Sequence, residues 1–134
     1  MYNKSMEIVA DASVFLTVVL NESDREWVID KTSGAAIVSP EILPYEIGNA
    51  LIAIMKKGRL DRREVLRAFE ISQKIAVKLV PVRISDALKI AGRFNLYAYD
   101  AYYLQCCMEN RLPLLSLDDR MCDVAENLEI KVVR

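Results

Sequence analysis

The chain has 134 residues, of which 53% are hydrophobic and 28% charged, and its net charge is −1. This composition is typical of one folded globular domain, and the near-zero charge excludes an overall attraction to a polyanion. The chain contains no histidine, which excludes a Ser-His-Asp triad and a histidine-ligated zinc site. Its four glycines are too scattered for a Walker A loop or a dinucleotide-binding fingerprint.

Short apolar runs alternate with amphipathic segments along the chain. Strands are predicted at residues 7–10, 35–38, 78–82, 112–117 and 130–133. Helices are predicted at residues 23–31, 40–57, 61–75, 85–94, 99–110 and 121–128. Residues 14–20 fit a helix or a strand, and Ser13 could cap a short helix there. The alternation predicts a single α/β domain over residues 1–134, with a parallel sheet covered by helices on both faces.

Two of these helices begin with a capping-box pattern. Ser23 is followed three residues later by Glu26, and Asp61 is followed in the same way by Glu64. In a capping box the first side chain binds a backbone N–H of the first turn, and the glutamate binds back to the capping residue. The pattern therefore predicts where both helices start.

Four acidic residues stand where a parallel sheet would bring them together. Asp11 and Asp118 each follow an apolar strand directly, and the carboxyl ends of parallel strands border the crevice in which such folds bind ligands. Asp100 lies at the start of the helix that precedes the second of these strands. Glu46 lies at the edge of the apolar stripe of the 40–57 helix, beside small residues that leave space around its carboxylate. We expect these four side chains to converge.

Each acid also has an ordinary structural explanation. Aspartate is favoured at helix starts, which would account for Asp100 and Asp119, and Glu46 could be a boundary residue of an amphipathic helix. Taken together, about four negative charges in one place repel each other unless hard cations neutralise them. Mg²⁺ and Mn²⁺ prefer oxygen ligands and suit a carboxylate site without histidine. The pattern indicates metal-dependent hydrolysis of phosphodiester bonds.

Four segments then resemble the PIN-domain ribonucleases, and most closely the VapC-type toxin subunits of toxin–antitoxin pairs. They are V-A-D-A-S-V at 9–14, P-Y-E-I-G-N-A-L at 44–51, Y-D-A-Y-Y-L at 99–104 and L-L-S-L-D-D-R-M at 114–121. The resemblance covers essentially the whole chain, including its length and the order of its elements. It implies a three-layer α/β/α sandwich, Mg²⁺ or Mn²⁺ as cofactor, RNA as substrate, a homodimer and a tightly bound antitoxin.

The family's acidic metal site maps, by this resemblance, onto four catalytic and metal-binding residues. These are Asp11, Glu46, Asp100 and Asp118. Four further residues would support them, namely Ser13, Asn49, Ser116 and Asp119. Ser116 stands where the family commonly has threonine, and Asp119 departs from a usual basic or neutral residue. Within this pair of adjacent acids, we expect Asp118 to face the site, and Asp119 to cap the following helix or to lie at the rim of the site as an additional charge.

Two other features of the sequence have a possible role in RNA binding. The densest basic run consists of Lys56, Lys57, Arg59, Arg62, Arg63 and Arg67. It is either a solvated helix end or a surface that steers RNA phosphates. Tyr97, Tyr99, Tyr102 and Tyr103 crowd the helix of Asp100, and one of them could stack on a base.

The remaining expectations concern location and alternative functions. The three cysteines form no C-x-x-C motif, and the chain start lacks a signal-peptide pattern, so we expect a cytoplasmic protein with reduced thiols and no membrane segment. A housekeeping RNA-processing nuclease without an antitoxin is the first alternative. A non-catalytic, Mg²⁺-binding receiver-like signalling domain and an inactive PIN-like scaffold are the others. The receiver fits poorly, because the expected acidic pair and the lysine after the last strand are missing.

Overall fold

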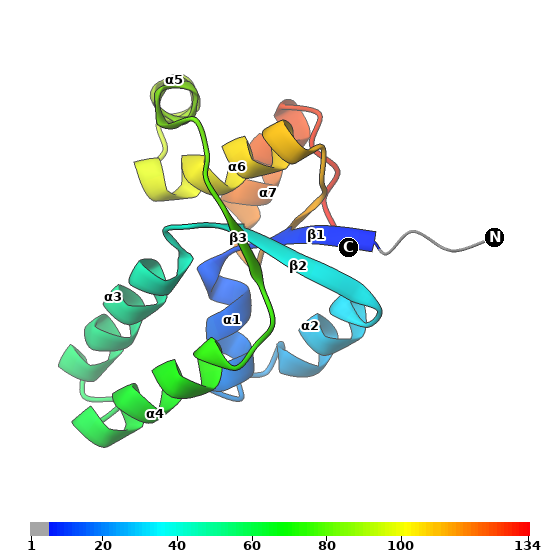
Figure 1. The fold of residues 1–134 in the computed structure, drawn as a ribbon. Helices are drawn as coiled ribbons and strands as arrows, with labels where there is room; N and C mark the ends of the chain where they lie inside the picture. Colours follow the sequence, from blue (N-terminus) through cyan, green and yellow to red (C-terminus); the bar gives the residue numbers. More distant parts are fainter. Residues whose placement is uncertain (1–5) are drawn as a thin grey trace.

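A computed structural model of the chain describes residues 6–134 and contains a four-stranded parallel sheet (Figure 1). The strands are β1 (Met6–Ala10), β2 (Ala35–Pro40), β3 (Lys78–Val80) and β4 (Leu114–Leu115), in the order β3-β2-β1-β4. The predicted parallel sheet is confirmed.

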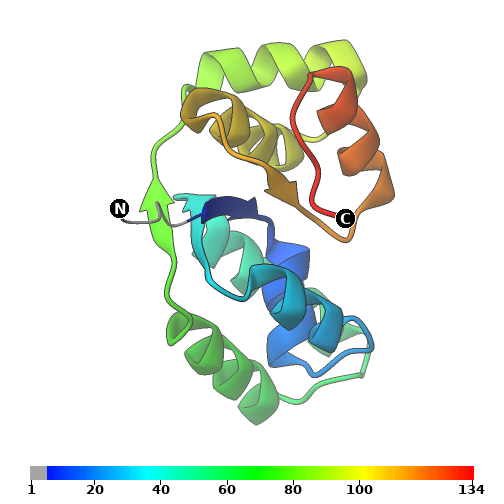
Figure 2. The same ribbon diagram turned by 90° about the vertical axis from the view of Figure 1, so that its right-hand side faces the viewer.

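Helices cover both faces of this sheet. The helices are α1 (Ala12–Val19), α2 (Arg25–Thr32), α3 (Leu43–Lys56), α4 (Arg62–Gln73), α5 (Ile84–Phe94), α6 (Ala98–Asn110) and α7 (Asp119–Asn127). Figures 1 and 2 show α1 to α4 on one side of the sheet and α5 to α7 on the other. The expected three-layer α/β/α sandwich is confirmed. Within residues 6–134, no helix is both long and apolar enough to cross a membrane.

The strand order reverses at β1, and this point positions the site. The chain passes from β1 to β2 and β3 on one side, and later returns to place β4 on the other side of β1. Val9 pairs with Leu114 and Ala10 with Leu115, so the two strands end at the same level. In open α/β sheets, ligands bind outside the carboxyl ends of the strands at such a switch point.

The core explains why these segments take their places. Ile8, Val9 and Ala10 of β1 are almost completely buried, as expected for a strand in a parallel sheet covered on both faces. On α6, Leu104 and Cys107 are equally buried, and this helix lies against β1, β2 and β4. The buried strand β1 therefore fixes the position of Asp11, which follows it directly.

Four predicted boundaries are wrong. Pro40 ends β2 instead of opening a helix, and α3 begins at Leu43. The 78–82 strand ends at Val80, because the following proline has no N–H for the ladder. The 112–117 strand is reduced to β4, since the backbone after it turns to contact side chains of the site. The 130–133 strand is reduced to a single bridge between Val132 and Leu114.

The helix caps also differ from the prediction at two places. The ambiguous 14–20 segment belongs to helix α1, which is capped by Asp11 and not by Ser13. The N-cap of α2 is Asp24 without a side-chain hydrogen bond, so the Ser23 capping box does not form. The Asp61 capping box forms with both of its hydrogen bonds.

Candidate active site

Asp11 stands at the carboxyl end of β1, at the centre of the sheet. Its backbone is extended (φ −90°, ψ 176°), and one carboxylate oxygen, Oδ1, accepts a hydrogen bond of 3.3 Å from the backbone N–H of Val14. This contact satisfies an otherwise unpaired amide in the first turn of α1. The side chain is only 6% exposed, so its charge lies in a largely dehydrated place.

Two serine hydroxyls hold the Asp11 carboxylate on both sides. Ser13 donates to Oδ1 and Ser116 donates to Oδ2, each at 2.5 Å. The same hydroxyls accept hydrogen bonds from the backbone N–H groups of Leu117 and Asp118, respectively. Because a hydroxyl has one hydrogen, these contacts direct the hydrogens of both serines towards Asp11. The end of β4 is thereby tied to the start of α1.

Glu46 approaches from the first turn of α3. Its Oε1 accepts a hydrogen bond of 2.7 Å from the hydroxyl of Tyr103, which lies on α6 and is 1% exposed. The contact joins helices on opposite faces of the sheet and fixes the direction of a half-buried carboxylate. Tyr103 is therefore a partner of Glu46 and is not available to stack on a base.

Asp118 and Asp100 come from the starts of two helices. Asp118 is the N-cap of α7, and its Oδ1 accepts a hydrogen bond of 3.2 Å from the backbone N–H of Met121. The expectation that Asp119 caps this helix is wrong, because Asp119 is already its first helical residue. Asp100 lies in the first turn of α6 and is partly buried.

Electrostatic interactions connect these four side chains into one group, which we call the acidic ring: Asp11, Glu46, Asp100 and Asp118. Burial raises the pKa of Asp11; its serine and amide hydrogen bonds oppose this, and the charge of Asp118 adds to it. Burial also raises the pKa of Glu46; the Tyr103 hydrogen bond opposes this, and the charges of Asp11 and Asp100 add to it. For Asp100, burial and then the charge of Asp118 raise the pKa.

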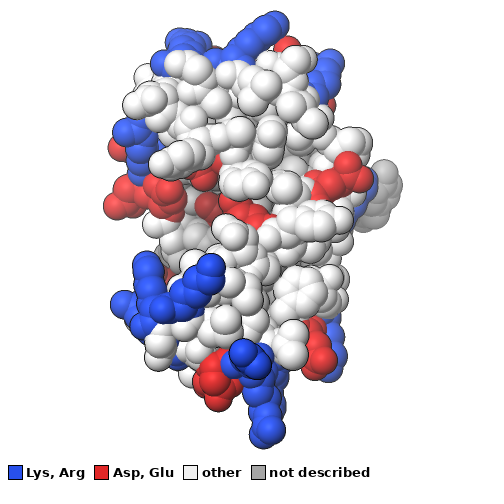
Figure 3. All heavy atoms as spheres, turned by 90° about the vertical axis from the view of Figure 1, so that its left-hand side faces the viewer, with Lys and Arg blue, Asp and Glu red and all other residues white. Residues whose placement is uncertain are grey.

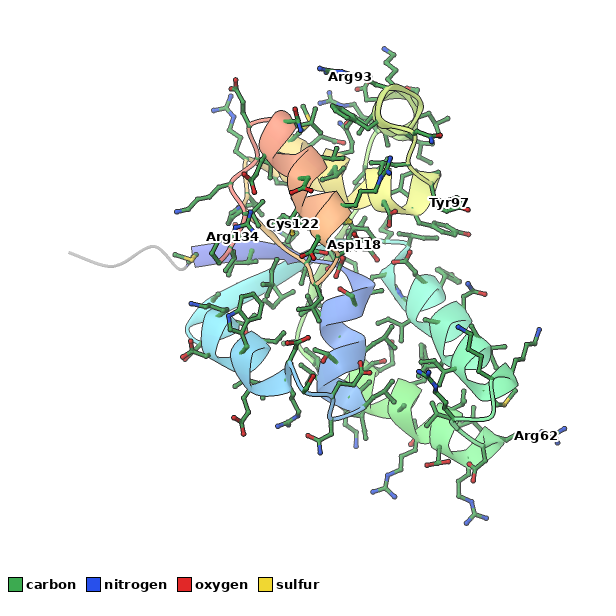
Figure 4. All side chains as sticks on the ribbon, turned by 180° about the vertical axis from the view of Figure 1, so that it is seen from behind. Arg62, Arg93, Tyr97, Asp118, Cys122 and Arg134 are labelled. Carbon is green, nitrogen blue, oxygen red and sulfur yellow. The ribbon has the colours of Figure 1, made fainter. Side chains whose placement is uncertain are left out.

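Uncharged residues make up most of the surface beside the acidic ring. Figure 3 shows acidic side chains gathered across the middle of the molecule, on the side where α3 and α6 lie, with mostly uncharged residues above and below them. Figure 4 shows Asp118 at the start of α7, near the middle of the molecule. It shows Tyr97 at the outer edge of the molecule. Tyr97 is 84% and Tyr99 is 48% exposed, so stacking on a base stays a prediction for these two residues, whereas buried Tyr103 is excluded from it.

The donor set of the acidic ring fits a hydrated divalent cation. Within residues 6–134, no three acidic or cysteine side chains lie close enough to ligate one ion directly. Mg²⁺ keeps several waters and is commonly bound through one or two carboxylates, so ligation by three side chains is not required. The raised pKa values of Asp11, Glu46 and Asp100 have the cause that a cation would relieve, namely negative charge away from water.

Of the other predicted residues, all of which lie within residues 6–134, only the two serines donate a hydrogen bond to an acid of the ring. Ser13 and Ser116 contact it directly, as described above. Asn49 is exposed one turn after Glu46, and no hydrogen bond joins it to an acid of the described chain. Asp119 is exposed beside Asp118. The basic run begins at the far end of α3, where Lys56 lies ten residues, or about 15 Å of helix, from Glu46.

Three residues at the site were not assigned these roles by the sequence. Ser39, at the end of β2, is fully buried and donates a 2.6 Å hydrogen bond to the carbonyl oxygen of Ala10. Tyr103 was one of four tyrosines that the sequence does not distinguish. Arg120 lies two residues after Asp118, and its charge lowers the pKa of Asp100 against the effects of burial and of Asp118.

Substitutions of the two adjacent aspartates are expected to differ in their effect on cleavage. Asp118→Asn removes a charge of the acidic ring but keeps the cap, because asparagine caps about as well as aspartate. We expect cleavage to fall by more than about 100-fold with little change in melting temperature, since the effect should exceed that of a group that only orients a ligand. Asp119→Asn, the matched control, should retain most activity. Greater damage from Asp119→Asn would show that the wrong aspartate has been assigned to the ring.

Removal of the Tyr103 hydroxyl is expected to weaken metal binding. Tyr103→Phe keeps the buried ring and deletes only the donor to Glu46, so the affinity for Mn²⁺ should fall about 10- to 100-fold. Titration of Mn²⁺ followed by electron paramagnetic resonance measures this without relying on cleavage. Tyr102→Phe is the control, because Tyr102 contacts Tyr99 edge to face, with 6.2 Å between ring centroids. Equal Mn²⁺ affinities in both variants and the unaltered chain would refute a positioning role for Tyr103.

The family of the protein follows from a comparison with family models. The PIN domain model matches residues 8–127, and the chain therefore belongs to the PIN-domain family. PIN domains are nucleases and generally use divalent metal ions, which defines the class of this protein. This membership removes the support for the receiver-like alternative. A search of curated proteins found no match.

Solved structures show the same fold over nearly the whole chain. PAE2754 from Pyrobaculum aerophilum is 23% identical with a TM-score of 0.69, and the match covers 93% of this chain and 95% of that chain. VapC20 of Mycobacterium tuberculosis, described as a toxin that cleaves the sarcin-ricin loop, is 11% identical with a TM-score of 0.63. That match covers 87% of this chain and 93% of VapC20. At these identities the likeness concerns the fold.

Proposed function

We propose that this protein is a metal-dependent endoribonuclease that hydrolyses RNA phosphodiester bonds, and that it is the toxin of a VapBC-type toxin–antitoxin pair. The observation that supports the proposal most is the acidic ring of a PIN-domain fold, in which the charge of one acid raises the pKa of another. The fold likeness to VapC20 supports the toxin role. We place the activity in the cytoplasm, where the buried thiols of Cys106, Cys107 and Cys122 stay reduced.

The acidic ring would hold the cofactor, which we propose to be Mg²⁺ or Mn²⁺. When bound, the cation would activate water and stabilise the charge that develops on the leaving oxygen. The serine hydroxyls would keep Asp11 in a fixed orientation, and Tyr103 would do the same for Glu46. Preorganised carboxylates lower the cost of assembling the site when substrate arrives. The residues of this chain thus supply binding and orientation.

Cleavage of RNA in the presence and absence of metal tests the nuclease proposal. The purified chain is incubated with mixed RNAs in Mg²⁺, in Mn²⁺ and in EDTA, beside the Asp100→Asn variant. We expect cleavage by the unaltered chain only when a divalent ion is present, and a severe loss of cleavage in the variant. Cleavage that persists in EDTA, or equally in the variant, would refute the metal mechanism.

We propose further that an antitoxin inhibits the protein by occupying the acidic ring. A basic side chain of the partner would offset the carboxylate charge in place of a metal ion. Co-expression with the neighbouring small gene is expected to yield a complex in which cleavage is suppressed. A chain that cleaves RNA but has no small protein encoded beside it, and that co-purifies with none, would favour the RNA-processing alternative.

The surface next to Glu46 supports a homodimer. Tyr45 of α3 and Ile84 and Leu88 of α5 are large apolar side chains that are 76%, 57% and 50% exposed. Tyr45 and Ile84 also border an apolar groove of about 260 Å³ between the start of α3 and the start of α5. A second copy of the chain would remove this surface from water.

A charged residue on this surface is expected to prevent dimerisation. Leu88→Glu should convert the dimer into a monomer, because the carboxylate would lose its hydration in the interface. Sedimentation equilibrium measures the mass at increasing concentration, and Lys89→Glu, next to it on α5, controls for added negative charge. A monomeric unaltered chain at high concentration would contradict the dimer.

A further inference from the structure

Arg120 is fixed at the rim of the acidic ring by the backbone of another helix. Its Nη2 donates hydrogen bonds to the carbonyl oxygens of Phe94, at 2.8 Å, and Asn95, at 3.3 Å. Asn95 is the left-handed residue (φ 55°) that ends α5, where carbonyl groups lack partners within the helix. The guanidinium therefore connects the start of α7 to the turn that leads into α6.

Arg120 joins the two segments that carry Asp118 and Asp100 of the acidic ring. Asp118 is two residues before Arg120 on one connected segment, and Asp100 is five residues after Asn95 on the other. Burial and Asp118 raise the pKa of Asp100, and the charge of Arg120 opposes them. Arg120 is exposed, and its Nε and Nη1 have no hydrogen-bond partner within residues 6–134. It thus has donors that point to no other group of the described chain.

The charges around the ring show why a local cation matters. The four carboxylates and the RNA backbone are both negative, so RNA is repelled from the place where it would be cut. The basic run starts about 15 Å of helix from Glu46, beyond the Debye length of about 8 Å at physiological salt. Figure 4 shows Arg62 of this run at the opposite end of the molecule from Arg93, and well away from Asp118. The run therefore does not offset the charge of the ring.

We propose that Arg120 binds a phosphate of the RNA strand beside the acidic ring. The proposal rests on the proposed ribonuclease function and adds a phosphate-binding residue to it. The two carbonyl contacts hold the side chain in one place, so little side-chain entropy remains to be lost when a phosphate binds. The exposed Nε and Nη1 donate to phosphate oxygens, a charge-assisted contact that is stronger than a neutral hydrogen bond.

Salt-dependent RNA binding tests this proposal. A fluorescently labelled, unstructured 12-nucleotide RNA is titrated with the protein in EDTA, so that metal-dependent cleavage does not interfere, at 50 to 300 mM salt. Arg120→Gln removes the charge and the guanidinium donors but keeps a polar side chain. We expect its dissociation constant to rise about tenfold, and the slope of log K against log salt to decrease by about 0.7, the value for one contact on a single strand. Arg120→Lys should restore the slope.

Arg93→Ala is the matched control, because Arg93 is an exposed arginine of α5 that stacks on Phe94, 4.7 Å from the ring centroid. For Arg93→Ala, the dissociation constant for RNA should stay within about twofold of the value for the unaltered chain. The salt slope of this variant should equal that of the unaltered chain within error. In Mg²⁺, Arg120→Gln should raise KM more than it lowers kcat. A variant with unchanged KM, dissociation constant and salt slope, and only a lower melting temperature, would show that Arg120 merely ties α7 to α5. Failure of the unaltered chain to cleave RNA contradicts the nuclease proposal instead.

Discussion

Asp11→Asn is expected to abolish cleavage while the melting temperature at pH 7.5 stays the same or rises. The variant loses the most buried charge of the acidic ring, and activity should fall by far more than the roughly 100-fold expected for a group that only orients a ligand. Asparagine still caps α1. The fold no longer has to bury a charge close to Asp118, which relieves both causes that raise the pKa of Asp11.

Asp24→Asn serves as the control for this experiment. Asp24 is the exposed N-cap of α2, has no side-chain cap hydrogen bond and lies outside the acidic ring, so the same chemical change should leave cleavage intact. Cleavage rates and thermal unfolding are measured on both variants. An Asp11→Asn protein that retains substantial cleavage would refute a catalytic role for Asp11, and one that no longer unfolds cooperatively would refute the expected stability.

The second large effect concerns pH, and stability and activity should change in opposite directions. A carboxyl whose pKa is raised in the folded state binds its proton more tightly there, so its contribution favours folding at low pH. That contribution is lost as the pH rises above the usual value, 3.8 for Asp11 and Asp100, and through the raised one. The metal-free chain should therefore melt at a higher temperature as the pH is lowered from 7.5 towards the raised pKa. Cleavage should decline over the same range, because protons compete with the metal ion for the carboxylates.

Metal binding should offset the repulsion between the carboxylates of the acidic ring at neutral pH. Saturating Mg²⁺ is expected to raise the melting temperature at pH 7.5, since a ligand that binds only the folded state stabilises it, and to have a smaller effect as the pH is lowered. Asp11→Asn should show a smaller dependence on both pH and Mg²⁺ than the unaltered chain. Identical pH profiles for the two proteins would mean that the acidic ring does not govern this dependence.

The fold was predictable where the signal is local. Apolar runs and capping patterns located most helices and the strands β1 and β2, because burial along one element leaves a period in the sequence. The errors lie where contacts between distant segments decide. The run at 112–117 has strand composition throughout, but Leu117 donates its N–H to Ser13 and leaves the ladder. A propensity read along the chain contains no information about that contact.

The same distinction applies to the site. Asp11 and Asp118 were predictable because each follows an apolar strand, and the sheet rule then places both at one edge. The assignment of the cap to Asp119 failed because either aspartate can cap a helix, and only the start of α7 separates them. The partnership of Tyr103 with Glu46 spans 57 positions of sequence, and no local pattern distinguishes this tyrosine from its three neighbours.

The hydrogen bond between Ser116 and Asp11 also has a consequence for the timing of synthesis. It joins residues that are 105 positions apart, so the site that contains Asp11 needs segments made at very different times. Ribosomes add about 5 to 20 residues per second and release the amino-terminal part first. A growing chain therefore contains Asp11 and Glu46 long before Asp100 and Asp118 exist. The site is completed only after Asp118 has been synthesised, and a partner protein already present can meet it from that moment.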